Sequence, residues 1–310
     1  MGKEYPVIIL GGGPAGLTAA IYTCRSRLKT LLVEHGLVGG QITLADRVEN
    51  FPGFPQGING MELGELVHQQ ASRFGLETLT AEVTGVEVSG DVFTVRTSNG
   101  DFRCSSLIVA LGADHQKLGV PGEEELLGHG VSYCANCDGA FFQGKEVAVV
   151  GGGNSAISDA LFLTKMVEKV HVVHRRRQLR AEAILQEQAM ASPKIEFVWD
   201  SVVERVEGDG VVNGLRLRRV DTGETSFLPL SGVFVAVGSV PATQALAGVV
   251  ELTPQGHIIT GHMMETSWPG IFACGEARHH TVRQAIASAG DGCTAAIAAI
   301  RYLQEKAPQP

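Results

Sequence analysis

The chain has 310 residues, 44% hydrophobic and 19% charged, a composition that excludes a disordered protein. At roughly 150 residues per domain, this length suggests about two domains. The formal net charge of −8 argues against a duplex nucleic acid partner, which needs a basic face on the protein.

The chain opens with a short apolar strand at residues 7–10, a glycine run, and a helical pattern over residues 17–27. Gly11, Gly13 and Gly16 fit the dinucleotide-binding fingerprint, in which they allow a tight turn, the approach of a pyrophosphate and close helix packing. The N–H groups at the helix start favour an anion. The alternative is a glycine-rich turn without a ligand.

A second strand, residues 31–33, ends in Glu34, which lies 18 positions after Gly16. A carboxylate at that spacing binds the hydroxyl pair of a ribose. The first unit is therefore expected to accept an unphosphorylated ribose, as in the ADP part of FAD. The alternative is a surface glutamate.

Two long uncharged runs, residues 5–24 and 225–250, are poor candidates for membrane helices, because glycines and prolines interrupt both. The first run lacks a basic leader and a small-residue cleavage site. We therefore expect a cytoplasmic protein without a membrane partner.

Residues 35–58 form a long Gly- and Pro-rich stretch without periodicity, which is typical of a functional or disordered loop. Asn59 is expected to cap a helix that runs to residue 74, with Gly75 as its stop. A hairpin turn is predicted at residues 98–101, between strands at 92–97 and 102–104, followed by a separate buried strand at 107–111.

The chain is expected to cross between domains near residues 112–115 and to return near 241–248. A strand at 270–274 and a helix at 282–304 then complete the first domain. The predicted class is α/β: two Rossmann-like three-layer dinucleotide-binding domains, with the NADPH domain (114–244) inserted into the FAD domain (1–113 and 245–310).

The NADPH assignment comes from a second fingerprint, 140 residues after the first. Residues 147–150 form an apolar strand that precedes Gly151, Gly153 and Ala156, and a helical pattern follows over 157–166. The next strand, 170–174, leads into a cluster of arginines where the first unit has an acid. Guanidinium groups there would hold a ribose 2′-phosphate. The alternative is a solvated basic patch.

Cys134 and Cys137 are separated by two residues, a spacing used for thiol–disulfide exchange. The alternative, half of a zinc site, lacks a second ligand pair. Asp138 could move a proton during exchange or be only a turn residue. Adjacent histidines at 279 and 280 are expected to point apart, so no metal site is predicted. The cysteines at 24, 104, 274 and 293 are expected to be buried small hydrophobes.

These features together describe an electron route. A flavin can accept two electrons from NADPH and pass them to a disulfide. The predicted route is NADPH to FAD to the Cys134–Cys137 disulfide. One hypothesis is that the inserted domain rotates on its two crossings to present nicotinamide and disulfide in turn.

The chain resembles the low-molecular-weight, bacterial-type thioredoxin reductases over nearly its full length. These enzymes are class II pyridine nucleotide-disulfide oxidoreductases. The resemblance rests on residues 11–16, 39–42, 48–53, 134–139, 151–156, 174–176 and 283–285. It implies a homodimer whose substrate is oxidised thioredoxin or a thioredoxin-like protein. It also implies that Cys137 lies nearest the flavin and begins exchange, with Asp138 as the acid.

By the same resemblance, Gln41, Asn50 and residues 283–285 contact the flavin, whereas Arg175, Arg176 and Arg180 hold the 2′-phosphate. The candidate catalytic residues are Cys134, Cys137 and Asp138. The candidate cofactor contacts are Gly11, Gly13, Pro14, Ala15, Gly16, Glu34, Gly40, Gln41, Asn50, Val83, Gly112, Gly275, Glu276, Arg283, Gln284, Ala285, Gly151, Gly153, Asn154, Ser155, Ala156, His174, Arg175, Arg176, Arg180 and Gly238.

The chain departs from the family pattern at three positions. Glu276 stands where an aspartate is usual, Leu111 where a threonine is usual, and Arg177 where an acid is common; Arg177 is expected to favour the phosphate further. Two other readings stay open. One is a related flavin disulfide oxidoreductase with another donor or acceptor, such as a dithiol oxidase or a ferredoxin-fed reductase. The other is a non-catalytic nucleotide or redox sensor.

Overall fold

The computed structural model describes residues 3–306. The chain divides into two compact units: residues up to Asp114 together with those from Val240 onward, and residues His115–Ser239. The sequence predicts these two divisions between residues 113 and 114 and between residues 244 and 245. The two segments at the division, β7 (Ala113–His115) and β16 (Ser239–Pro241), pair with each other as a two-stranded sheet.

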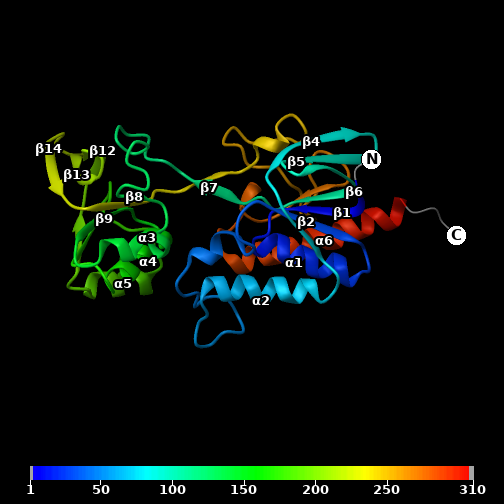
Figure 1. The fold of residues 1–310 in the computed structure, drawn as a ribbon, viewed down its shortest axis with the longest axis horizontal. Helices are drawn as coiled ribbons and strands as arrows, with labels where there is room; N and C mark the ends of the chain where they lie inside the picture. The colour runs from blue at the N-terminus through cyan, green and yellow to red at the C-terminus, as the bar shows by residue number, and fades with distance from the viewer. Residues whose placement is uncertain (1–2, 307–310) are drawn as a thin grey trace. The chain divides into compact units, whose positions relative to one another are not determined.

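The first unit is an α/β layer structure around a mainly parallel sheet with strand order β3-β2-β1-β6-β5-β4, in which β17 also pairs with β6 (Figure 1). Its elements are β1 (Glu4–Leu10), α1 (Pro14–Arg25), β2 (Thr30–Glu34), the 3₁₀ helix η1 (Gly40–Leu44), α2 (Gly60–Ser72), β3 (Glu77–Thr80), β4 (Val83–Ser89), β5 (Val92–Thr97), β6 (Gly100–Val109), η3 (Gln244–Leu246), β17 (Ile271–Ala273), η4 (Gly275–Ala277) and α6 (Ala285–Lys306).

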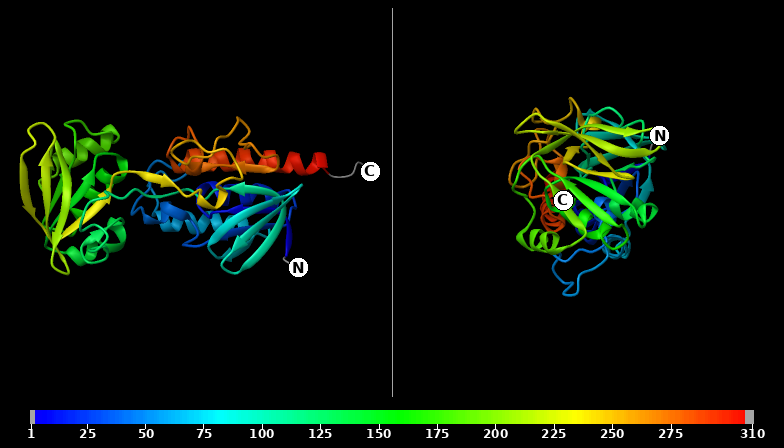
Figure 2. Two further views of the ribbon diagram at one scale, coloured as in Figure 1. Left: turned by 90° about the horizontal axis from the view of Figure 1, so that it is seen from above. Right: turned by 90° about the vertical axis from the view of Figure 1, so that its left-hand side faces the viewer.

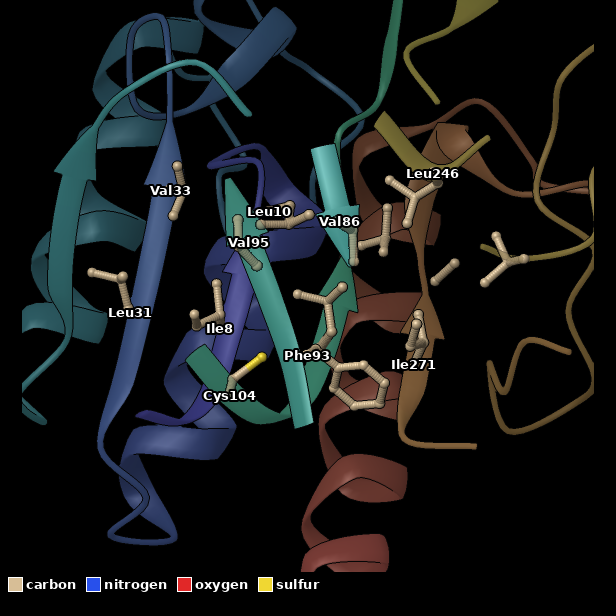
Figure 3. Close-up of a cluster of buried hydrophobic side chains, with 14 of the residues drawn as sticks. Ile8, Leu10, Leu31, Val33, Val86, Phe93, Val95, Cys104, Leu246 and Ile271 are labelled. Atoms are coloured by element: carbon tan, nitrogen blue, oxygen red, sulfur yellow. The ribbon is translucent and has the colours of Figure 1, made fainter. Parts of the chain in front are cut away.

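Strand β1 shows why this sheet is covered on both faces. Its side chains alternate, so Ile8 and Leu10 enter one buried cluster whereas Val7 and Ile9 enter the other. Figure 3 shows residues of the first cluster, among them Ile8 and Leu10 of β1 and Phe93 of β5. The second cluster is covered by α1, α2 and α6, which lie on one side of the sheet in both views (Figures 1 and 2).

The second unit repeats the design with a parallel sheet of order β11-β10-β9-β15-β8. Helices α4 and α5 cover one face, and a three-stranded antiparallel sheet, β12-β13-β14, covers the other. Its elements are β8 (Val131–Ser132), α3 (Ala135–Asp138), η2 (Gly139–Phe142), β9 (Glu146–Gly151), α4 (Asn154–Leu163), β10 (Lys169–Val173), α5 (Ala183–Ala191), β11 (Ile195–Val198), β12 (Ser201–Gly208), β13 (Val212–Arg219), β14 (Thr225–Pro229) and β15 (Gly232–Ala236). The predicted α/β class with two Rossmann-like units is confirmed.

The expected elements are present, but several limits differ. Helix α1 starts at Pro14, which suits the first helical position, and ends before Arg27, whose φ of 62° is incompatible with a helix. Asn59 caps α2 as predicted, since its side chain accepts from the Met61 and Glu62 N–H groups.

The predicted hairpin needs one correction. Strand β6 runs without a break from Gly100 to Val109, so the expected strands at 102–104 and 107–111 are a single strand. Its first half pairs antiparallel with β5 and its second half parallel with β17. Within the described residues, no helix is long and apolar enough to cross a membrane.

Candidate functional site

The first glycine turn leaves the start of α1 open to an anion. Gly11 has φ +98°, and a Cβ on it would overlap the Ala110 carbonyl oxygen. Gly13 precedes α1 and no side chain caps the helix there. A Cβ on Gly13 would find its nearest neighbour, Gly39 O, at 3.9 Å. The free helix N–H groups and this open space suit a pyrophosphate.

Glu34, at the end of β2, stabilises the same turn by hydrogen bonds. Its carboxylate accepts hydrogen bonds from the N–H groups of Gly12 and Gly36, both at 2.7 Å. Each oxygen keeps lone-pair capacity for a further donor. The carboxylate therefore lies where the sequence places a ribose-binding acid.

The long loop 35–58 packs against the first glycine turn through Gly39 and Gly40. Gly39 N donates to Gly12 O at 2.8 Å, and a Cβ on Gly40 would meet Gly13 Cα at 2.9 Å. The loop is held by a small apolar cluster around Val48 and Ile58, which form an isolated bridge. Its lack of periodicity therefore reflects this separate cluster rather than disorder.

Two other predicted residues, 234 positions apart, meet directly: Asn50 Nδ2 donates to Gln284 Oε1 at 3.0 Å. Gln41 Nε2 donates to the Ala113 carbonyl. The structure thus brings the loop to the first residue of β7 and to the segment that precedes α6, both within the first unit.

Glu276, the unusual residue of the C-terminal segment, offers a test of whether a flavin fits. Burial raises the pKa of its carboxyl, and the nearby Arg283 opposes this shift. Within residues 3–306 no donor lies within hydrogen-bond distance of this carboxylate. A half-buried acceptor without a donor is what the hydroxyls of a ribityl chain would satisfy. The residues present therefore fit the cofactor, despite the longer side chain.

A largely buried ion pair that sequence reasoning missed supports this segment. The Asp291 carboxylate on α6 accepts from Arg278 Nε at 2.7 Å and Nη2 at 3.2 Å, and from Gly275 N at 3.3 Å. The side chains are 17% and 12% exposed. The pair thereby fixes the Gly275 turn to α6. This ion pair can be recognised only in the structure, because it depends on the packing of α6 against the turn at Gly275.

Replacing Asp291 with alanine should destabilise the protein, because it leaves the Arg278 charge buried without a partner. We expect a loss of about 3 kcal/mol in the free energy of unfolding, measured by urea denaturation. Asp91→Ala, which breaks the exposed pair with Lys306, should cost far less. Equal losses in the two variants would contradict this role of Asp291.

The second glycine turn has the same open geometry. Gly153 precedes α4 without a side-chain cap, and a Cβ on it would meet nothing within 4 Å. His174 is buried against Gly152, so tightly that a Cβ on that glycine would overlap its ring. Burial lowers the pKa of His174, which keeps its ring neutral near pH 7. His174 therefore shapes the turn by packing.

The arginines after β10 divide into two groups. Arg175, Arg176 and Arg180 are exposed, and no carboxylate of the described chain lies within ion-pair distance of them. Arg177 instead pairs with Asp200 at 2.5 Å. This ion pair compensates the Arg177 charge and so counts against the expectation that Arg177 adds to phosphate binding, which stays a prediction. The partner could not be foreseen, since Asp200 follows a different strand.

Cys134 and Cys137 form a disulfide. Cys134 caps α3, and its Sγ accepts from Cys137 N at 3.1 Å. Cys137 is the more exposed of the two. Asp138 ends the same four-residue helix and is half-buried. The two sulfurs and the carboxylate are thus presented together.

The other cysteines are only partly as expected. Cys24, Cys104 and Cys274 are buried. Burial raises the pKa of Cys104 to about 12 and that of Cys24 above its usual value. Cys293 is half-buried, so the expectation of a buried position is wrong for it.

The histidines at 279 and 280 are also not arranged as expected. Their ring centroids lie 3.7 Å apart, because His280 has φ +58° and belongs to neither a helix nor a strand. The argument that adjacent side chains diverge does not apply to such a turn. Within residues 3–306 no group of three or more potential metal ligands is found.

The remaining predicted contacts take simpler positions. Asn154 exchanges two hydrogen bonds with Glu182, a partner missed in the sequence. Val83 begins β4 and packs at the margin of the first core. Helix α1 begins with Pro14 and Ala15, and helix α6 begins with Ala285. The first turn of α4 contains Ser155 and Ala156. Gly112 immediately precedes β7, and Gly238 immediately precedes β16.

Comparison with known proteins agrees with this arrangement. A family described as pyridine nucleotide-disulphide oxidoreductase matches residues 5–292. A thioredoxin reductase of Streptomyces coelicolor is 46% identical over 96% of this chain and 93% of its own length, and one of Listeria monocytogenes is 44% identical over 98% and 95%. A crystal structure of Lactococcus lactis thioredoxin reductase is similar with a TM-score of 0.95 and 42% identity, over 97% of this chain and 99% of the other.

Proposed function

Because the chain belongs to the pyridine nucleotide-disulphide oxidoreductases and is similar to thioredoxin reductases over nearly its full length, we propose that it reduces the disulfide of thioredoxin with NADPH, using FAD. The Cys134–Cys137 disulfide carries this proposal, together with a glycine turn in the same unit beside arginines that have no carboxylate partner among residues 3–306. We assign FAD to the first unit and NADPH to the second.

A bound flavin would supply two-electron chemistry between the nicotinamide and the disulfide. The chain's own groups supply the rest. Arg175 and Arg176 would hold the 2′-phosphate, whereas Glu34, already bonded to Gly12, would bind the ribose of FAD. The same carboxylate would repel a 2′-phosphate, so each unit accepts one dinucleotide.

Disulfide reduction gives two thiols, which reduce the substrate by exchange. The Cys137 thiolate attacks one sulfur of the substrate disulfide and forms a mixed disulfide, and the other substrate sulfur leaves as a thiolate. Cys134 then attacks Cys137 Sγ, so the second substrate sulfur leaves and the Cys134–Cys137 bond re-forms. Two electrons pass to the substrate, and the two protons given up by the Cys134 and Cys137 thiols end on its two thiolates, one of them relayed by Asp138.

The test is a stopped-flow titration of the purified yellow protein. NADPH should bleach the flavin absorbance, NADH should do so far less effectively, and oxidised thioredoxin should restore the colour. A colourless protein that takes up no FAD would contradict the proposal. Rapid reoxidation by oxygen alone, without a response to thioredoxin, would indicate a dithiol oxidase instead.

Asp138→Asn should slow disulfide exchange, because the amide cannot protonate the leaving thiolate. We expect the rate of thioredoxin reduction to fall about 10²-fold while NADPH bleaches the flavin at the wild-type rate. Asp114→Asn, a change outside the disulfide helix, serves as the control. An unchanged exchange rate in the Asp138 variant would leave that residue only a structural part of the turn.

The proposal includes a homodimer, by analogy with the family, and a cytoplasmic location. Free thiols at Cys24, Cys104 and Cys274 are compatible with a reducing compartment. Sedimentation of the FAD-loaded protein would test the dimer.

A further inference from the structure

The second unit contains a buried carboxylate that the proposed reaction does not use. Glu123 is 1% exposed, and no cation of the described chain lies within ion-pair distance. Its Oε1 accepts from Leu118 N at 2.8 Å, and its Oε2 from Gly119 N at 2.7 Å. These two amides belong to the segment by which the chain enters the second unit. The carboxylate therefore secures this entering segment.

The same carboxylate also holds the residue before the redox disulfide. Tyr133 donates its hydroxyl to Glu123 Oε1 at 2.7 Å. Burial, and next the bond to Glu123, raise the pKa of Tyr133, so its hydroxyl stays a donor. The ring of Tyr133 stacks on that of His115, with centroids 5.6 Å apart and planes inclined by 19°. Cys134 follows directly, its N–H bonded to Ser132 Oγ at 3.0 Å.

Residues 115–119 and 133–134 are thus connected by side-chain contacts in addition to the backbone between them. The bonds are made to a buried carboxylate, and a hydrogen bond to a charged acceptor is stronger than a neutral one. Removal of one donor leaves the others in place, but removal of the charge affects all three. Such a set holds its members in one arrangement.

On the basis of the proposed function, we propose that Glu123 and Tyr133 are positioning residues for the Cys134–Cys137 disulfide. They make the entering segment and the disulfide-bearing segment one rigid piece. A displacement of the entering segment is then transmitted to Cys134 rather than absorbed between them. The disulfide consequently meets the flavin, and later the substrate, in a fixed orientation.

Glu123→Gln tests this proposal, because one carboxylate oxygen becomes an NH₂ group that cannot accept from an amide. The matched control is Glu124→Gln, which removes the same charge one residue later. Glu124 is exposed and pairs only with Lys117 among the described residues, at 2.6 Å. Tyr133→Phe removes a single hydroxyl and serves as the mild variant should Glu123→Gln fail to fold.

The first measurement is amide hydrogen exchange of the FAD-loaded protein, which does not depend on turnover. In Glu123→Gln we expect exchange at Leu118 and Gly119 to rise at least tenfold, accompanied by a similar rise at Cys134 and Cys137. Tyr133→Phe should show the same joint change to a smaller degree, and Glu124→Gln neither. Loss of protection at residues 118–119 with residues 134–137 unchanged would overturn the proposal, since the segments would then be independent.

The second measurement is rapid-reaction kinetics. The rate of flavin reduction by NADPH should stay within twofold of wild type in Glu123→Gln and in Glu124→Gln. The rate of electron transfer from the flavin to the disulfide should fall about tenfold in Glu123→Gln. Equal rates of that transfer in Glu123→Gln and Glu124→Gln would overturn the positioning role. If the wild-type protein itself fails to reduce thioredoxin, the proposed function is at fault, and hydrogen exchange alone decides between rigid and independent segments.

Discussion

Cys137→Ser is expected to abolish thioredoxin reduction, with kcat falling at least about 10³-fold, while NADPH still bleaches the flavin. The hydroxyl cannot form the redox bond, so electrons that reach the flavin have no path to the substrate. Because Cys137 is exposed and its helix is only four residues long, the substitution should leave the fold intact. The two half-reactions are therefore separable in one variant.

The measurement is steady-state thioredoxin reduction beside stopped-flow flavin reduction. Cys293→Ser is the matched control, because Cys293 is also partly accessible but lies on α6 in the first unit. It should retain wild-type turnover. Turnover above a tenth of the wild-type rate in Cys137→Ser would show that another thiol carries the exchange.

The double variant Arg175→Ala/Arg176→Ala should raise the KM for NADPH about 100-fold and leave that for NADH nearly unchanged. Hydrogen bonds between charged groups contribute about 1.5–3 kcal/mol each, and two of them account for a change of this size. Both guanidinium groups are exposed and unpaired within the described chain, so removing them should not destabilise the fold.

Arg177→Ala is the control for this variant. It deletes the same charge from the same turn, but its guanidinium is already bound to Asp200. We expect less than a threefold change in the KM for NADPH. Equal increases for NADPH and NADH in the double variant would show that the arginines do not recognise the phosphate.

The sequence predicts the local structure around the candidate site well where that structure depends on the spacing of neighbouring residues. The glycine fingerprints, the acid at the end of β2, the arginines after β10 and the Cys-x-x-Cys pair are all defined by a few neighbouring residues. Their local backbone is determined by steric limits, such as the overlap that a Cβ on Gly16 would make with Gly11 O. Such constraints can be read without the fold.

What the sequence does not predict depends on contacts between distant segments. Asp291 meets Arg278 only because α6 lies against the 275 turn, and Asp200 meets Arg177 because β11 lies beside β10. Glu123 is followed by two further glutamates, which is typical of a solvated surface rather than of a buried acceptor. Its burial follows from the amides around it, which no periodicity reveals.

The pairing of β7 with β16 has a consequence for how such a chain can be assembled from parts. Within the second unit Gln116 N donates to Gly238 O at 2.9 Å, and within the first Ala242 N donates to Gly112 O at 3.1 Å. The two ends of the inserted stretch are therefore adjacent, and so are the two ends of the gap it leaves. The gene segment for the second unit can therefore be exchanged for that of a relative, or expressed alone. A short turn is then enough to join the two parts of the first unit.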